Sequence, residues 1–324
     1  MSHGARRTLI LLLPEWKRCL ASEALDSGVL AAWCSRGQRL DGLDPGNDGI
    51  LASCFEWSGE SLPVAALRRQ AELGDAGDSN WLCADPAHVR ADMATARMLA
   101  CGAMGLSDSE RERFARDLGS LFGDAGFEFD APGNERWYVR ALRESELPRC
   151  GSPDEVMGDD LKLHLPSGTA GRLWRRLFND AQILLHNHKV NAERAARGAI
   201  SINSLWFWGG GFLPNRVRAH VQQLVSDRLE VRALAERAGV AWKPLLAESL
   251  AAALESATAD AVVALDLVEL RDRELECRWL QPVQDCLRTQ QVDLLELRFA
   301  SGERYRVNRW QRMKFWKPIQ RLGS

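Results

Sequence analysis

The sequence lacks an apolar run long enough to cross a bilayer. Its first apolar run, residues 9–13, follows Arg6 and Arg7 and stops at Pro14 and Glu15. Such a run is far too short for a transmembrane helix and too short for the core of a signal peptide, and no small-residue cleavage site follows it. We therefore expect a cytoplasmic protein without a membrane partner, in which this run is a buried first strand.

The sequence also lacks a Cys-x-x-Cys pair and the cysteine spacing of a small disulfide framework. Free thiols in a reducing compartment are the simplest interpretation of such a pattern. No cysteine lies in a recognisable nucleophile context. We expect all eight to be free, at positions 19, 34, 54, 83, 101, 150, 277 and 286.

Strong net charge is absent as well, since 42 Lys and Arg residues stand against 44 Asp and Glu residues. The overall electrostatics therefore predict no polyanion or membrane partner. Tyrosine is scarce, with two residues, whereas there are twelve tryptophans, which bury large areas in cores and also occur at binding surfaces. A chain of 324 residues can form one large domain or two lobes with a sizeable core.

Apolar runs and helical patterns alternate along the chain, without an internal repeat. A capping box at Ser107 and Glu110 opens one amphipathic helix, and apolar positions 173, 177, 181 and 184 mark another. Buried strands are expected at residues 9–13, 81–84, 202–208 and 262–268, and residues 292–299 are expected to pair with 304–308. The fold class that follows is α/β, with a mixed, largely parallel sheet flanked by helices.

The best candidate boundary lies at residues 150–153, where Cys-Gly-Ser-Pro is followed by acidic residues. It divides the chain into an N-terminal α/β lobe, residues 1–150, and a C-terminal α/β lobe, residues 151–324.

The most informative stretch places a group of polar residues before a strand that ends in three glycines. His186, His188, Asn191 and Arg194 precede Asn203, and the strand then ends at Gly209, Gly210 and Gly211. Glycine permits positive φ and close approach of the backbone to a ligand, and successive exposed N–H groups form anion-binding concavities. The alternative is a tight strand-to-helix turn. The ligand-site interpretation predicts a pocket whose floor is the glycine segment, with His188, Asn191 and Arg194 beside it.

This stretch resembles part of the archaeal-type, cofactor-independent phosphoglycerate mutases, although Lys189 stands where their pattern has Pro. It resembles more closely the RpfE-type bacterial regulatory proteins, which share the patterns at residues 182–191, 203–211 and 84–88 and the Phe315-Trp316 ending. The resemblance implies a fold related to alkaline phosphatases and phosphoglycerate mutases. It also implies a regulatory role.

A working mutase of this superfamily needs two metal ions held by Asp and His, and an activated Ser or Thr. Here no Asp follows the first strand before Asp26, and no His follows His220. His186 and His188 point to opposite sides if both are helical. We therefore predict no metal site, no cofactor and no mutase activity, and we assign no catalytic residue. A divalent ion is expected only if the chain is nevertheless an active enzyme.

Two further features have competing interpretations. Asp85 and His88 follow a predicted strand end, where α/β sheets bind ligands, but Asp85-Pro86 is also typical of an Asx turn. The basic C-terminal residues alternate with aromatic ones, as in nucleic-acid-binding segments, yet a terminal segment packed on the core has the same composition. These basic residues include Arg304, Arg306, Arg309, Arg312 and Lys314.

The sequence thus favours a cytoplasmic regulatory protein of the RpfE type that is not an enzyme and binds a phosphorylated small molecule or a protein partner. One alternative is a metal-dependent phosphomutase or phosphohydrolase of the cofactor-independent phosphoglycerate mutase family. A second alternative is a nucleic-acid-associated module that uses the basic C-terminus.

Overall fold

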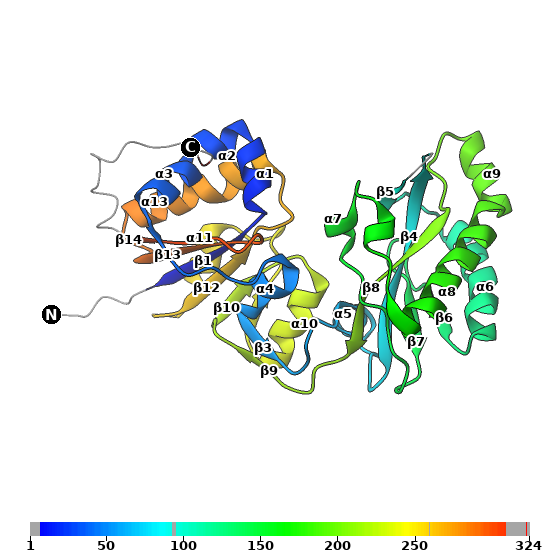
Figure 1. Ribbon diagram of the computed structural model, residues 1–324. Helices are drawn as coiled ribbons and strands as arrows, with labels where there is room; N and C mark the ends of the chain where they lie inside the picture. The colour runs from blue at the N-terminus through cyan, green and yellow to red at the C-terminus, as the bar shows by residue number, and fades with distance from the viewer. Residues whose placement is uncertain (1–6, 93–94, 259, 309–321, 323–324) are drawn as a thin grey trace. The chain divides into compact units, whose positions relative to one another are not determined.

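The computed structural model describes residues 7–92, 95–258, 260–308 and 322 (Figure 1). The chain forms two compact units, and they do not follow one another along the sequence. The first unit combines Met1–Ser58 with Asn215–Ser324, and the second is Gly59–Pro214.

The first unit contains a seven-stranded sheet whose centre is the predicted first strand, β1 (Thr8–Leu13). Five neighbouring strands are parallel, and the last two pair antiparallel. The sheet confirms the prediction of a mixed, largely parallel sheet. Its order is β11 (Ala241–Lys243), β10 (Gln223–Val225), β12 (Val262–Asp266), β1, β13 (Leu294–Phe299), β14 (Arg304–Asn308) and β2 (Gln38–Arg39).

Helices lie on both faces of this sheet. Figure 1 shows α1 (Trp16–Ala21), α2 (Glu23–Ser27), α3 (Val29–Arg36) and α13 (Gln281–Arg288) on one face, and α4 (Gly46–Ala52) and α10 (Leu229–Ala238) on the other. Alternate β1 residues, Leu9, Leu11 and Leu13, belong to an apolar core in this unit. The remaining elements of the unit are α11 (Leu250–Glu255), α12 (Asp272–Glu274), a π-helix (Leu275–Leu280) and the strand pair β3 (Phe55–Trp57) and β9 (Val217–Ala219).

The second unit is built on one long strand, β4 (Asn80–Ala91). It pairs antiparallel with β8 (Ser204–Phe212), and with β7 (Tyr138–Ala141) and β5 (Ala96–Cys101) at different points of its length, while β6 (Glu128–Asp130) pairs with β7. The helices of this unit are α5 (Val64–Leu73), α6 (Asp108–Asp124), α7 (Pro153–Val156), a 3₁₀ turn (Leu161–Leu163), α8 (Gly168–His186) and α9 (Lys189–Ala196). The predicted capping box is present, because Ser107 and Glu110 bond reciprocally at the start of α6.

Two expectations differ from the structure. The predicted strand end at Asp85 is not an end, because β4 continues to Ala91 while β8 pairs with it from Phe212 to Ser204. The same pairing joins residues on both sides of position 150, so the compact units do not coincide with lobes 1–150 and 151–324.

All eight cysteines are free thiols in the structure. No helix among the described residues is both long and apolar enough to cross a membrane.

Candidate functional site

The three glycines lie within strand β8 and do not form a tight turn. Gly209 has φ of 62° and Gly211 has φ of 146°, and both values disfavour residues with a side chain. The register between β4 and β8 shifts between Trp81 and Cys83, opposite these glycines. The segment is therefore a bulged strand end, which differs from the strand-to-helix turn of the alternative interpretation.

Packing accounts for each glycine. A Cβ atom on Gly209 would lie 2.8 Å from Val64 Cβ, and one on Gly211 would lie 2.9 Å from Pro63 Cβ. A Cβ atom on Gly210 would lie 2.9 Å from Leu147 Cδ1. Gly209 and Gly211 thus allow β8 to approach the start of α5 closely, and Gly210 allows it to approach Leu147.

Gly210 and Gly211 also line a pocket of about 420 Å³. Its polar lining comes from residues that precede the glycines in sequence, and His188, Asn191 and Arg194 are not among them. The lining residues that carry polar or charged side chains are Ser61, Asn80, Glu146, Arg149 and Ser167.

His188 caps helix α9 and lines a different pocket. Its Nδ1 accepts a hydrogen bond from the Val190 N–H at 3.2 Å, so in the neutral ring the proton is on Nε2, which donates to Asp117 Oδ2 at 3.1 Å. The ring packs on Phe114 with centroids 4.5 Å apart. The pocket here has a volume of about 400 Å³ and includes Arg113, Arg116, Asp117, Leu184, Asn187 and Lys189.

Asn191 is buried and holds backbone groups rather than facing a pocket. Its amide nitrogen donates to the carbonyls of Leu185 at 2.7 Å and Ile202 at 2.8 Å, and its oxygen accepts from the Ile202 N–H at 2.9 Å. Asn203 bonds to the backbone of Val89 in a similar way. Its amide oxygen accepts from the Val89 N–H and its amide nitrogen donates to the Val89 carbonyl, both at 2.8 Å.

Arg194 is fully buried and its guanidinium is used within the protein. It forms an ion pair with Glu110 at 3.1 Å and donates to the carbonyls of Ile200 and Met104, both at 2.7 Å. The predicted single pocket is therefore not assembled: the glycine segment and His188 line separate pockets, and Asn191 and Arg194 tie loops together.

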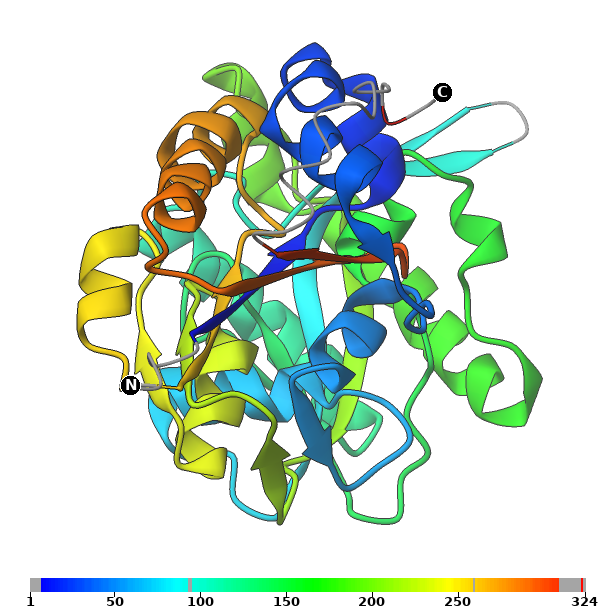
Figure 2. The same cartoon turned by 90° about the vertical axis from the view of Figure 1, so that its left-hand side faces the viewer.

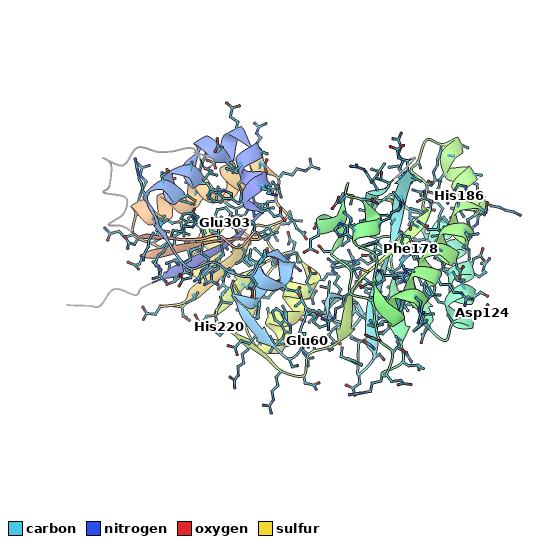
Figure 3. The ribbon with its side chains drawn as sticks, viewed as in Figure 1. Glu60, Asp124, Phe178, His186, His220 and Glu303 are labelled. Atoms are coloured by element: carbon cyan, nitrogen blue, oxygen red, sulfur yellow. The ribbon has the colours of Figure 1, made fainter. Side chains whose placement is uncertain are left out.

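Asp85 and His88 have separate partners and do not form an acid–base pair. The Asp85 carboxylate accepts from Trp137 N–H at 3.2 Å and from Trp208 Nε1 at 2.8 Å, and burial raises its pKa. His88 Nδ1 lies 3.0 Å from the carbonyl oxygen of Ser201. His186, labelled in Figure 3, is the exposed last residue of α8.

A polar cluster that we did not predict from the sequence lies at the carboxyl ends of β10 and β12 in the first unit. Ser226 Oγ donates to Asp266 Oδ2 at 2.7 Å, and Arg228 Nε donates to the same oxygen at 2.7 Å. Arg228 Nη1 donates to Asn47 Oδ1, while its Nη2 is buried without a hydrogen-bond partner in the described part of the chain. Burial opposes the charge on Arg228, but Asp266 and Glu230 outweigh it and raise the pKa of the guanidinium.

The position of this cluster is where ligands bind in open α/β sheets. The sequence carried one usable signal, since Asp266 falls within a predicted strand, near its end. Strand β10 has only three residues, and without it Ser226 and Arg228 had no predicted location.

The donor set does not fit the two-metal centre that the resemblance implies. Among the described residues there is no group of three or more His, Cys, Asp or Glu side chains that could hold a metal ion. At the carboxyl edge, a guanidinium and a hydroxyl occupy the Asp266 oxygen that would be a metal ligand. We therefore assign no step to a metal ion.

No protein-family model matches the chain. Part of it is homologous to curated 2,3-bisphosphoglycerate-independent phosphoglycerate mutases. A probable enzyme of this name from Geobacter sulfurreducens is 26% identical over 189 residues, which cover 56% of this chain and 46% of that protein. The enzyme from Methanosarcina acetivorans is 25% identical over 178 residues, 54% of this chain and 44% of that protein. The chain thus matches less than half the length of these relatives.

Two solved structures align along most of the chain at 12% identity. A cofactor-independent phosphoglycerate mutase from Thermoplasma acidophilum gives a TM-score of 0.40 over 93% of this chain and 89% of that one. The PH0037 protein from Pyrococcus horikoshii gives 0.45 over 94% and 87%. Because both scores are below 0.5, they support no argument about function.

The relatives correct the functional prediction. We expected a non-enzymatic regulatory protein of the RpfE type, but the curated relatives named above are phosphoglycerate mutases. They favour the first alternative, an enzyme of the cofactor-independent phosphoglycerate mutase kind.

Proposed function

We propose that the protein acts on a phosphorylated hydroxy acid of the phosphoglycerate type, as a phosphomutase or phosphohydrolase. The observation that carries the proposal is the similarity to curated phosphoglycerate mutases over 56% of the chain. The polar cluster at the carboxyl ends of β10 and β12 supports it, because it joins an arginine to the sheet edge at which α/β proteins bind ligands.

Arg228 is the proposed phosphate-binding residue of this cluster. A guanidinium presents its N–H groups in a rigid fork that suits phosphate oxygens, and Nη2 of Arg228 has no partner among the described residues. Asp266 and Asn47 hold the other two nitrogens and so fix the direction of Nη2. Ser226, fully buried, positions the Asp266 carboxylate.

The proposal is tested with the purified protein and 3-phosphoglycerate, with manganese or cobalt added and both 2-phosphoglycerate and inorganic phosphate measured. We expect turnover above background, and a loss on the order of 10²-fold in Arg228→Ala, the size typical of removing one donor to a reacting anion. Arg232→Ala is the matched control, because Arg232 pairs with Glu236 on the exposed side of α10. Absence of both products with either metal contradicts the proposal.

Since Arg228 is buried, its removal can also unfold the protein. Circular dichroism of the variants separates the two effects, and Arg228→Lys retains the charge but not the fork. An inactive but folded Arg228→Lys variant supports phosphate recognition by the guanidinium. A fully active one excludes that role.

A further inference from the structure

Three arginines gather around one glutamate on the β13–β14 hairpin. The antiparallel register places Glu296 opposite Arg306 and Arg298 opposite Arg304. Because side chains alternate between the faces of a strand, these four residues share one face of the sheet. Figure 2 shows the hairpin, in orange to red, beside the blue strand β1.

The single carboxylate contacts all three guanidinium groups. Its oxygens lie 2.8 Å from Arg298 Nη2, 2.8 Å from Arg306 Nη2 and 3.4 Å from Arg304 Nη2. The four residues therefore carry two more positive charges than negative ones. Concentrating like charge in a partly buried cluster is unfavourable unless another anion compensates it.

The three arginines are not equivalent. Arg298 is nearly buried and its remaining nitrogen, Nη1, donates to the Ser53 carbonyl at 2.7 Å and to Ser53 Oγ at 3.0 Å. The side chains of Arg304 and Arg306 are 23% and 40% exposed. Each touches Glu296 through one Nη atom, and their Nε atoms have no partner among the described residues.

We propose that Arg304 and Arg306 form a binding site for a small dianion that carries a phosphate group, with Arg298 and Glu296 as the residues that position them. A phosphate monoester has a charge between about −1.5 and −2 at pH 7, which matches the excess charge of the cluster. Its three terminal oxygens suit the free N–H groups of two neighbouring guanidinium forks. This site uses different residues from those of the proposed activity and does not depend on it.

The experiment measures binding of inorganic phosphate to the full chain by calorimetry at low ionic strength, with 3-phosphoglycerate as a second ligand. We expect saturable binding that weakens by about tenfold or more in Arg304→Ala and in Arg306→Ala, as for the loss of one charged hydrogen-bond partner. Arg176→Ala is the matched control, because it removes an 80% exposed arginine from helix α8. Unchanged affinity in the Arg304→Ala, Arg306→Ala double variant overturns the proposal.

Two further variants keep the outcome clear if an alanine variant fails to fold. Arg306→Lys retains the charge and is expected to bind phosphate, whereas Arg306→Gln is expected to bind it at least tenfold more weakly. Equal binding by the two contradicts the proposal. A third result would identify the kind of ligand. If 3-phosphoglycerate binds saturably and inorganic phosphate does not, and if the same variants lose this binding, then the ligand of the site is a phosphate ester.

A nucleic acid is the competing occupant of this arginine cluster. If the cluster binds nucleic acid, a single-stranded oligonucleotide should bind far more tightly than phosphate, and its affinity should fall steeply as the salt concentration rises. That result, together with absent phosphate binding, overturns the small-dianion site. Weak or absent oligonucleotide binding alongside saturable phosphate binding supports it.

Discussion

At the scale of single residues, the buried polar side chains show why residue type alone misplaces a site. Arg194 and Asn191 have the chemistry of ligand-binding residues, yet each is buried and bonded to the protein's own backbone. Arg228 is equally buried, and one of its nitrogens has no partner in the described structure. The difference lies in hydrogen-bond partners that come from distant parts of the chain, which a sequence pattern does not contain.

Glu296 gives a pH-dependent prediction at this scale. Burial opposes its charge, but hydrogen bonds from Arg306 and Arg298 outweigh burial and lower its pKa from 4.5 to about 2. The folded state thus holds this proton more weakly than the unfolded state. The resulting stabilisation is fully present above pH 4.5 and is lost as the pH falls towards 2.

We expect Glu296→Gln to lower the free energy of unfolding at pH 7 by ~3 kcal/mol, which is the shift converted at 1.36 kcal/mol per pKa unit. Urea unfolding at pH 7 and at pH 3 measures the difference in unfolding free energy between the unmodified protein and the variant. This difference should be smaller at pH 3. Glu60→Gln is the control, because Glu60 is 80% exposed in a surface ion pair. A difference that stays constant with pH would show that the carboxylate's charge is not the cause.

At the scale of elements, the sequence predicted what depends on local patterns. The pairing of β13 with β14 and the capping box at Ser107 are confirmed, and a strand is present near residues 202–208, although it begins at Ser204 and runs through the glycines to Phe212. The sequence did not predict strand β10, which has only three residues. It also underestimated the length of β4, because the local pair Asp85-Pro86 is typical of a turn that ends a strand. Both errors have one cause: pairing with a strand far away in sequence decides the extent of these strands.

Substitutions at three glycines can separate two effects on stability: strain from a positive φ angle, and crowding of an added Cβ atom by its neighbours. Gly198 and Gly209 have φ of 73° and 62°, but a Cβ atom on Gly198 meets nothing within 4 Å whereas one on Gly209 lies 2.8 Å from Val64 Cβ. Gly119, inside helix α6, has neither constraint.

We expect Gly119→Ala to raise the free energy of unfolding by about 1 kcal/mol through helix propensity. Gly198→Ala should lower it by about 1–2 kcal/mol through left-handed strain, and Gly209→Ala should lower it further because Val64 must move. Chemical denaturation of the three variants measures the series. Equal effects at positions 198 and 209 would show that β8 is not closely packed on α5.

At the scale of the whole chain, the sequence predicted the class of fold but placed the division elsewhere. The first unit is assembled from two separate segments, because β1 pairs with β12 and β13 more than 250 residues later. Residues 59–214 lie between them as one continuous segment. A search for polar or glycine-rich linkers finds local boundaries, such as residues 150–153, and does not reveal an insertion between paired strands.

The second unit should therefore fold by itself. Residues 59–214 contain all the strands that pair with β4, and an aromatic network that includes Trp174 with Phe207 and Phe178 with Trp206. We expect a fragment of residues 59–214 to unfold cooperatively in urea, with dispersed amide resonances. Fragment 1–150 lacks β8, so residues 80–87 of β4 lose a partner strand and the core loses Trp206 and Phe207; it should not unfold cooperatively. A cooperative 1–150 fragment together with an unfolded 59–214 fragment would place the division at residue 150 and contradict the two units described above.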